Sequence, residues 1–524
     1  MIAIKDMVEN PHPIYLRYKP YWDFLLQSYE GGIDYAGSVV QQSNQGLFDS
    51  IFRVFINGQQ QTTQTLTGNL FMHPKERVAD YSKRLQMSYY YNFCAPIIDI
   101  YSNHLFKVPV IEEFEDLQTT VDSVGEDIDK SGSSISEFRK EIADIAQIFG
   151  HVFVLVDSPS IPESEVLTKQ DQIDNRAFPY LTIIYPQNLI NWALDENGKP
   201  YWVLIRECFE GNKDPATFDK NRKDLVVYKL WTRFGWEMYD NEYNLMAGSA
   251  HPVGEVPIVC VFDKKSRKVK SFLGVSSLAD IAFIARDIYN SCSELRQILR
   301  DQTFAFLAIN GSSDEYSELE IGTGKGLLYP EGRNKPEYVS PPSDNAQVYF
   351  DHIDRQVTKI FELAKLEGGG TGGRVKAQPQ VDQQSGVSKA WDFNQTNSAL
   401  NEKAGNLEDG EYKIWRFVSL WQGQEFTGKI KYPNEFSVTS LKDDLDELEQ
   451  EMRCMMGKTF NVEVRKTIIK KKFPNKDKND IEEMVKEVEE EQDVNDEAKQ
   501  LTNRYSSMFN KNAGGNGGKS PFGR

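Results

Sequence analysis

The sequence has few cysteines, no long apolar run and no excess of positive charge, and each absence excludes a class of protein. Its 524 residues include five cysteines, none in a Cys-x-x-Cys spacing, which excludes a disulfide framework and predicts reduced thiols. No apolar stretch reaches the roughly 20 residues that a membrane-spanning helix needs. The N-terminus also lacks the apolar segment of a secretory signal. We therefore expect a soluble, intracellular protein without a membrane partner.

The charge balance is acidic, because 60 Lys and Arg face 78 Asp and Glu and leave a net charge of −18. A broad basic surface that wraps nucleic acid is therefore excluded, and any contact with DNA must be local or must use an acidic surface that prevents sticking. Hydrophobic residues make up 40 % of the chain and aromatic residues 12 %, enough for a sizeable core. A chain of this length allows two to four domains at about 100–200 residues each.

Motifs for catalysis, cofactors and metals are also missing. The six histidines form no HExxH motif and no Cys/His pair at zinc spacing, and no GxSxG motif is present. The segment 322–325 resembles a phosphate loop, but Leu319 and Gly326 stand where that motif needs Gly and Ser or Thr. The GxGxxG match at 368–373 follows a predicted helix instead of a strand. We predict no catalytic residues, no cofactor and no metal.

The first half of the chain has an α+β pattern. Residues 1–70 predict an N-terminal arm of short strands and loops, and 76–106 predict one helix that Pro96 interrupts. A capping box at Ser134 and Glu137 opens a second predicted helix, and Gly150 suits its C-terminal end. A buried strand is expected at 151–157 and a hairpin around 196–198, so the region 110–260 is predicted to be α+β.

The most regular helical pattern covers 274–301, where apolar residues recur at i, i+3, i+4 and i+7 over about 40 Å. Four carboxylates recur every seven residues and therefore share one face, away from the apolar stripe. That face is either an ordinary solvated surface or the lining of a channel or partner surface. Arginines 286, 296 and 300 are available to pair with neighbouring helices. The four carboxylates are Asp280, Asp287, Glu294 and Asp301.

After this helix the chain predicts short strands and turns over 303–344, a second helix over 345–366 and a third over about 388–420. Between the last two lies a glycine-rich segment, which is either a linker or a mobile, mildly basic loop that touches a phosphate backbone. Residues 441–500 are charged and predicted to be helical, and 501–524 are predicted to be disordered. The residues that mark the loop are Gly368, Gly369, Gly370, Gly372, Gly373, Arg374 and Lys376.

This order of elements resembles that of the bacteriophage portal proteins, the head–tail connectors. The resemblance covers about 75–435 and consists of order and short patches: LVDSP (155–159), PYLTIIYPQNLINW (179–192), EVPIV (255–259), LGVSSLADIA (273–282) and SGVSKAWDFNQTNSAL (385–400). It implies an α+β subunit with wing, stem, clip and crown, assembled as a ring. The implied parts are an arm (1–70), a wing (71–271), a first stem helix (272–302), a clip (303–344), a second stem helix (345–366), a tunnel loop (367–387), a long wing helix with a return strand (388–440), a crown-like region (441–500) and a tail (501–524).

The resemblance implies a ring, usually of twelve copies, at one capsid vertex of the virion, assembled in the host cytoplasm. Double-stranded DNA would pass through the ring during packaging and ejection. The terminase large subunit, the head–tail adaptor and the major capsid protein would be its partners. The four stem carboxylates would line the channel, where negative charge keeps DNA from sticking, and the tunnel loop would make transient phosphate contacts.

Two other functions stay open at this point. One is a metal-dependent nucleic-acid enzyme with an unrecognised site, for which a monomer with divalent-metal-dependent activity would be the sign. The other is a different structural protein of the virion head or its adaptor, which would lack two antiparallel stem helices around a small β unit.

Overall fold

A computed structural model gives the fold, and the chain divides into two compact units, Met1–Phe436 and Ser437–Arg524. In the second unit, which includes the predicted crown-like region and tail, only residues 465–466, 469 and 484–487 are described, and all of them are helical. The structure describes residues 4–37, 39–40, 65–66, 68–159, 178–209, 225–267, 272–303, 306–308, 337–339, 344–365, 386–434, 436, 465–466, 469 and 484–487.

The N-terminal region is mainly helical, so the prediction of an arm of strands and loops is wrong for most of its described residues. Helices α1 (Ile4–Glu9), α2 (Pro13–Glu30) and α3 (Gly32–Ala36) precede the two-residue strands β1 (Val39–Val40) and β2 (Thr65–Leu66). Aromatic residues favour strands by propensity. In α2, however, Tyr15, Trp22 and Leu25 recur at helical spacing and are buried. Burial of that stripe outweighs the local preference.

The region 76–106 forms two helices, α4 (Val78–Met87) and α5 (Cys94–Leu105), instead of the single predicted one. The chain leaves α4 at Ser88, whose backbone is extended and whose Oγ donates to the Arg84 carbonyl at 2.7 Å. The side chain of Asn92 then accepts hydrogen bonds from the backbone N–H groups of Cys94 and Ala95, both at 3.0 Å. Pro96 lies in the first turn of α5, where a missing N–H costs nothing, so it does not interrupt a helix.

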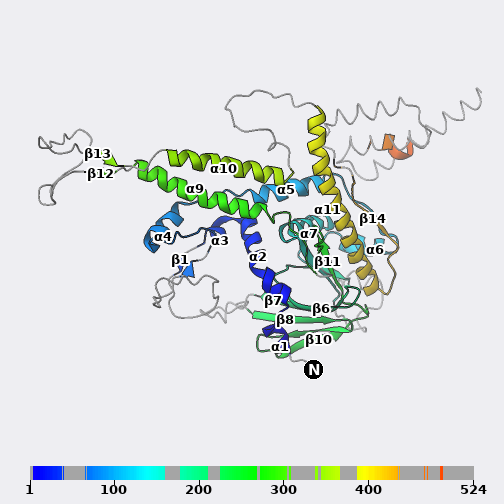
Figure 1. The fold of residues 1–524 in the computed structure, drawn as a ribbon. Coiled ribbons are helices and arrows are strands. Elements are labelled where there is room, and N and C mark those ends of the chain that lie inside the picture. The colour runs from blue at the N-terminus through cyan, green and yellow to red at the C-terminus, as the bar shows by residue number, and fades with distance from the viewer. Residues whose placement is uncertain are drawn as a thin grey trace, which may run out of the picture. The chain divides into compact units, whose positions relative to one another are not determined.

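The centre of the unit is a three-stranded antiparallel sheet in the order β11-β4-β5 (Ile258–Phe262, His151–Asp157, Tyr180–Ile184). The capping box predicted at Ser134 and Glu137 opens helix α7 (Ile135–Phe149), and Gly150 closes it in the left-handed conformation at φ 90°. Strand β4 follows at once, and six of its seven residues are buried. Both α7 and the long helix α11 (Gly386–Trp421) pack against β4 and β11 (Figure 1).

A second antiparallel sheet has the order β10-β9-β8-β7-β6. The hairpin predicted around 196–198 joins β6 to β7, and Asp195 accepts from the backbone N–H groups of Asn197 and Lys199 in its turn. The fold class is α+β, as predicted. The strands of this sheet are β6 (Leu189–Leu194), β7 (Pro200–Phe209), β8 (Leu225–Thr232), β9 (Gly235–Tyr239) and β10 (Leu245–Ala250).

The remaining elements complete the first unit. Strand β3 (Ile111–Glu113) pairs antiparallel with β14 (Lys429–Lys431), and the short helices η1 (Glu115–Leu117) and α6 (Gln118–Val124) follow β3. Helix α9 (Ile281–Thr303) leads to strands β12 (Phe306–Ala308) and β13 (Glu337–Val339), and helix α10 (Asp344–Leu363) follows. Helix α9 begins seven residues later than predicted, because 277–280 form turns and Gly274 is held in a β-bridge with Lys265.

Candidate functional site: the hairpin of two long helices

Helices α9 and α10 form an antiparallel pair, which we call the hairpin. Tyr349 OH of α10 donates to Glu294 Oε2 of α9 at 2.7 Å, and His352 Nε2 lies 2.8 Å from Asp287 Oδ2. The residue number rises along one helix as it falls along the other, so the two helices run in opposite directions. Between them in the chain, β12 pairs antiparallel with β13 at the far end of the helices (Figure 1). The described residues therefore contain two long helices that bracket a small β unit.

One half of α9 is anchored in the first unit. Ile281, Ala285 and Tyr289 are among its buried residues. Asn290 accepts from the Phe71 backbone N–H at 2.7 Å and donates to the Asn69 carbonyl at 3.0 Å. Beyond Leu295, no residue of α9 is buried. The anchored half therefore fixes the direction of a helix whose other half extends past the packed region.

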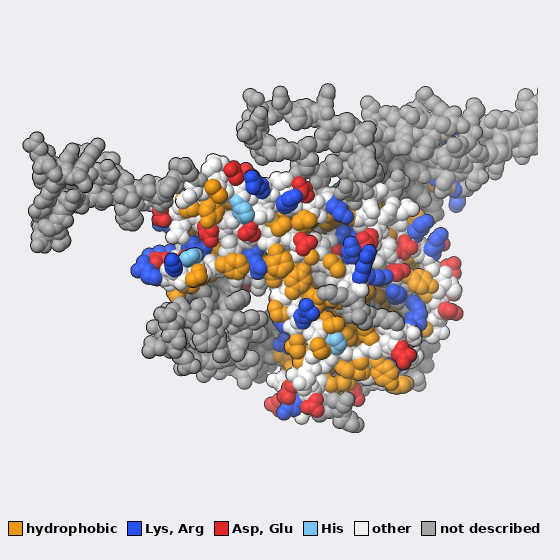
Figure 2. Space-filling view, viewed as in Figure 1, with side chains coloured by type: hydrophobic (Ala, Val, Ile, Leu, Met, Phe, Trp, Pro, Cys, Tyr) orange, Lys and Arg blue, Asp and Glu red, His pale blue; other side chains and the backbone are white. Residues whose placement is uncertain are grey.

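Helix α10 leaves much of its apolar surface uncovered. Ala346 and Ile360 are buried, but Val348 is 67 % exposed and Phe350 is 46 % exposed. Apolar side chains reach the surface over the hairpin in the space-filling view (Figure 2). An amphipathic helix normally buries its apolar face. The hairpin thus has apolar surface that one copy of the chain does not cover.

All four carboxylates that were predicted to share a face are exposed. Exposure is expected for residues that lie away from the buried apolar stripe of the helix. Asp287 and Glu294 contact His352 and Tyr349 of α10, so these two are partly engaged within the hairpin. Asp280 lies in the turn before α9, not within the helix as expected, and its carbonyl accepts from Ile284 N–H. Asp280 and Asp301 make no side-chain hydrogen bond or ion pair with the described residues.

The chain enters α9 through a tight contact between two glycines. A Cβ atom on Gly274 would lie 1.8 Å from the Gly150 carbonyl oxygen, so only glycine fits there. Ser276 Oγ donates to the Ile148 carbonyl at 2.6 Å and accepts from Leu278 N–H at 2.9 Å. These bonds join the start of α9 to the end of α7.

A buried ion pair connects α11 to the same entry point. Lys403 of α11 pairs with Asp263, which follows β11, and the two side chains are 9 % and 3 % exposed. Lys403 also donates to Ser277 Oγ, and Ser277 donates to Asp263 Oδ2 at 2.6 Å. Helix α11 and the segment between β11 and α9, which are more than 120 residues apart in sequence, therefore hold the base of the hairpin together. Sequence analysis missed this cluster, because its members lie up to 140 residues apart.

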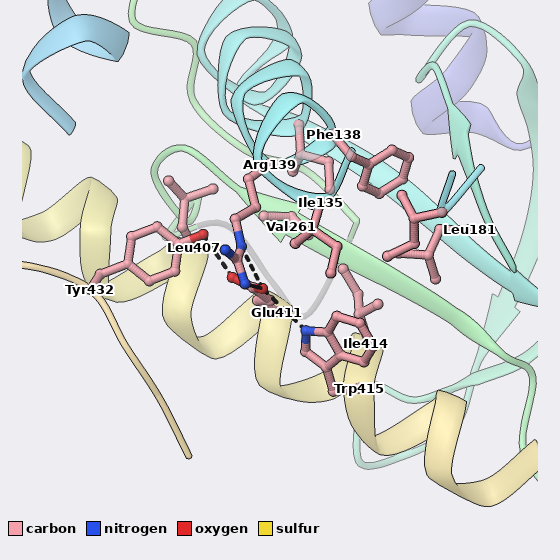
Figure 3. Close-up of a pocket in the computed structure, with 12 residues that line it drawn as sticks. Ile135, Phe138, Arg139, Leu181, Val261, Leu407, Glu411, Ile414, Trp415 and Tyr432 are labelled. Atoms are coloured by element: carbon pink, nitrogen blue, oxygen red, sulfur yellow. Dashed lines mark hydrogen bonds and ion pairs between the residues drawn. The ribbon is translucent and has the colours of Figure 1, made fainter. Parts of the chain in front are cut away.

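A second buried network lies around Glu411 of α11 (Figure 3). One carboxylate oxygen accepts from Arg139 Nε at 2.7 Å and from Trp415 Nε1 at 3.1 Å, and the other accepts from Tyr432 OH at 2.8 Å. Arg139 also pairs with Glu112. Burial acts to lower the pKa of Arg139, but Glu411 and Glu112 outweigh it and raise that pKa. The adjoining cavity measures about 20 Å³, room for one water molecule, so this network is part of the core.

The described residues hold no group of three or more His, Cys, Asp or Glu side chains that could bind a metal. Among the helices of the described part of the chain, none is long and apolar enough to cross a membrane. The seven residues that mark the predicted tunnel loop lie outside the described residues: Gly368, Gly369, Gly370, Gly372, Gly373, Arg374 and Lys376.

Comparison with known proteins gives little further guidance. No family model matches the chain, and no curated protein matches it. Among solved structures, the chain is similar to one described as the neck of an empty GTA particle computed with C6 symmetry, at 12 % identity. The match covers 70 % of this chain and 88 % of that one, with a TM-score of 0.41. A score of that size does not establish a common fold, so function is inferred from the chain's own residues.

Proposed function

We propose that this chain is the subunit of a portal-type connector, a ring at one capsid vertex of a virion through which double-stranded DNA passes. Copies would assemble in the host cytoplasm and then remain in the particle. The ring would admit DNA during packaging, retain it and release it on ejection. The chain itself would carry no catalytic site, and ATP hydrolysis would belong to a packaging motor that docks on the ring.

The observation that carries this proposal is the hairpin. Its two helices of 23 and 20 residues run antiparallel and bracket a small β unit, the arrangement that the resemblance implies for two stem helices around a clip. Apolar side chains of both helices are exposed in one copy, among them Val348 and Phe350 of α10 and Leu299 of α9. Neighbouring copies around a ring would cover them. A connector of this kind thus accounts both for the length of the helices and for their exposed surface.

The acidic face of α9 supports a channel role. Asp280 and Asp301 have no side-chain partner among the described residues, and Asp287 and Glu294 remain exposed although they contact α10. In a ring, each residue would recur once per copy and form a negative ring along the channel. Negative charge lowers the affinity for phosphates, so DNA slides instead of binding.

The remaining roles follow from the resemblance. The region 303–344 would be the clip that contacts the terminase large subunit and later the head–tail adaptor. The region 71–271 would be the wing that contacts the major capsid protein. The glycine-rich segment with Arg374 and Lys376 would be the tunnel loop, where a few cations balance the acidic lining through transient phosphate contacts.

Shortening 368–373 tests the tunnel-loop assignment. We expect rings to assemble normally, while heads built with the variant protect far less DNA from nuclease. Unchanged packaging with intact rings would contradict the assignment.

The channel assignment has a separate test. Replacing Asp280 and Asp301 by Asn should raise the affinity of assembled rings for duplex DNA at low salt. The gain should shrink as salt is added, because screening weakens the repulsion that was removed. The control is Asp6→Asn with Asp23→Asn, the same charge change on α1 and α2. Equal DNA binding by both pairs would contradict a channel lining on α9.

A further inference from the structure

Three arginines of α9 have no carboxylate partner among the described residues. The Arg286 guanidinium carbon lies 4.5 Å from the ring centroid of Phe24, 5.2 Å from that of Phe71 and 5.1 Å from that of Phe283. Arg296 donates to the Met87 carbonyl at 2.6 Å, and Arg300 contacts the Met87 sulfur. We call the side of α9 with Arg286, Arg296 and Arg300 the arginine flank.

The missing partners are unusual for this chain. Acidic residues outnumber basic ones by 78 to 60. Three other arginines of the first unit that are partly or fully buried have carboxylates: Arg84 pairs with Glu76 at 2.7 Å, Arg416 with Glu255 at 3.0 Å, and Arg139 with Glu411. Arg286 is half-buried, and that burial lowers its pKa. A cation that has lost water and has no counter-charge gains from a carboxylate brought by a partner.

The surface around Arg286 has the composition of an interface. Phe71 is 56 % exposed and Phe283 is 45 % exposed, although both lie against the guanidinium. Aromatic residues and arginine are enriched in the buried centres of protein interfaces. The partner that fits is therefore a surface with a carboxylate and apolar neighbours.

The outer face of α10 carries such a surface. Tyr349 and His352 face α9, so Asp351 and Asp354 lie on other sides of α10, where both are exposed. Asp351 accepts from Gln347 of the same helix at 3.0 Å, whereas the Asp354 carboxylate has no partner among the described residues. Val348 and Phe350 add exposed apolar surface to this helix.

Arg286 and Asp354 also lie at the same level along the hairpin. The contact between Asp287 and His352 sets the register of the two helices. Arg286 precedes Asp287 by one residue, and Asp354 follows His352 by two, about 3 Å of helix rise at most. In a ring whose axis runs parallel to the hairpin, all copies hold a given residue at the same height along that axis. Residues at similar heights in one copy can therefore contact each other across the boundary between neighbouring copies.

We propose that Arg286 of one copy receives the Asp354 carboxylate of the next copy, so that the arginine flank of α9 packs on the outer face of α10 in a head-to-tail contact. This contact rests on the ring proposed above and names the surfaces that close it. Each copy contributes an arginine flank on one side and an acidic helix on the other, the heterologous pattern from which rings are built. Charge complementarity at this contact would also fix the register between copies.

The other candidate to cover the surface beside Arg286 is the chain's own segment 41–64, which precedes Phe71 in the sequence. That segment contains a single carboxylate, Asp49, whereas a second copy presents an acidic helix. We therefore assign the contact to the second copy and use Asp49→Asn to test the other occupant.

The experiment follows assembly of the full chain against concentration by mass photometry. Arg286→Glu and, separately, Asp354→Lys should each raise the concentration at half-assembly about tenfold or more. The double variant, which restores opposite charges, should return to within about threefold of the native chain. Asp354→Lys alters an exposed side chain and is the safer variant for folding. The control is Arg17→Glu on the exposed side of α2, which should assemble like the native chain.

Three outcomes would overturn the contact. The first is that both single variants assemble at the same concentration as the native chain. The second is that the double variant needs as high a concentration for half-assembly as the single variants. A loss of thermal stability shared by Arg286→Glu and Asp49→Asn, with Asp354→Lys unaffected, would identify segment 41–64 as the occupant. If the native chain forms no assembly at any concentration, the proposed function fails as well, which separates the two failures.

Discussion

The packed region around β4 and the α9–α10 hairpin differ in whether their ion pairs are buried or exposed to solvent. Around β4, charged side chains are buried and paired: Lys403 and Asp263 are 9 % and 3 % exposed. On the hairpin, the charged contact between the two helices stays in solvent, because the side chains of His352 and Asp287 are 43 % and 49 % exposed. A buried charge without a partner is costly, so the packed region must satisfy its charges within one copy. The exposed charges of the hairpin have no such constraint, and the half-buried Arg286 of α9 is left without a carboxylate among the described residues.

Apolar surface follows the same division. All but the last residue of β4 are buried, whereas α10 leaves Val348 and Phe350 in solvent. The packed region thus buries its apolar surface within one copy of the chain, whereas the hairpin leaves apolar surface exposed, which in the proposed ring would be covered by neighbouring copies. Substitutions in the first region should change stability, and substitutions in the second should change assembly.

The largest effect on stability should come from Lys403→Met. This change leaves the Asp263 carboxylate buried without its cation, which costs about 3–5 kcal/mol when a buried pair is broken in this way. The shift in the denaturant midpoint at constant m-value measures it. Lys264→Met is the matched control, because Lys264 and Glu402 form an exposed pair at 3.9 Å, and it should cost less than about 1 kcal/mol. Equal losses would contradict the claim that burial, and not the ion pair as such, makes the Lys403–Asp263 contact important.

Two glycines of α11 should respond in opposite directions to the same substitution. A Cβ atom on Gly410 would lie 2.9 Å from Val261 Cγ2, whereas a Cβ on Gly405 would meet nothing within 4 Å. Gly405→Ala should therefore stabilise the protein by about 1 kcal/mol through helix propensity. In Gly410→Ala, overpacking should lower the free energy of unfolding by about 1–3 kcal/mol, and the same gain in helix propensity offsets part of that loss. Thermal melts of both variants test this, and stabilisation by Gly410→Ala would show that α11 packs loosely on β11.

Asp144 of α7 should make the free energy of unfolding depend on pH. Burial raises its pKa above the ordinary value of 3.8, and Asp99 and Glu141 act in the same direction. The folded state therefore binds the proton more tightly than the unfolded state, so this residue's contribution to stability falls as the pH rises from 3.8 through the raised pKa. Asp144→Asn should remove that fall and stabilise the protein at pH 7. Unfolding free energies between pH 4 and pH 7 measure it, and an unchanged pH profile would argue against the burial.

The smallest effect on stability should come from the hairpin itself. Tyr349→Phe removes an exposed hydrogen bond to Glu294, and His352→Gln removes the exposed contact with Asp287. Each should change the free energy of unfolding by less than about 0.5 kcal/mol, as surface substitutions usually do. Chemical denaturation of both variants would check this. A loss above about 2 kcal/mol would mean that these contacts belong to the packed core.

Local sequence signals predicted the elements that depend on local bonds. The capping box at Ser134 and the glycine at 150 mark both ends of α7, and both act within a few residues. The start of α9 was predicted too early, because the turn before it is held by hydrogen bonds of Ser276 to Ile148, 128 residues away, and of Ser277 to Asp263. Helix α2 was missed for a related reason, since its aromatic stripe becomes a helical signal only when other segments bury it.

The candidate site shows the same limit. The seven-residue spacing of its carboxylates predicted a shared face on one helix; all four are exposed, but only Asp287, Glu294 and Asp301 lie on α9, because Asp280 falls in the turn before it. It did not predict that Tyr349 and His352 of another helix would contact two of them. The buried networks around Lys403 and Glu411 had no signal in the sequence, because each joins residues that only the fold brings together.

The most direct test of the central claim is electron microscopy of the purified full-length protein, viewed end-on in negative stain. The account predicts closed rings with a central hole, in which neighbouring copies cover the hairpins. Single particles of about the 60.0 kDa chain mass, without symmetry even at high protein concentration, would contradict it.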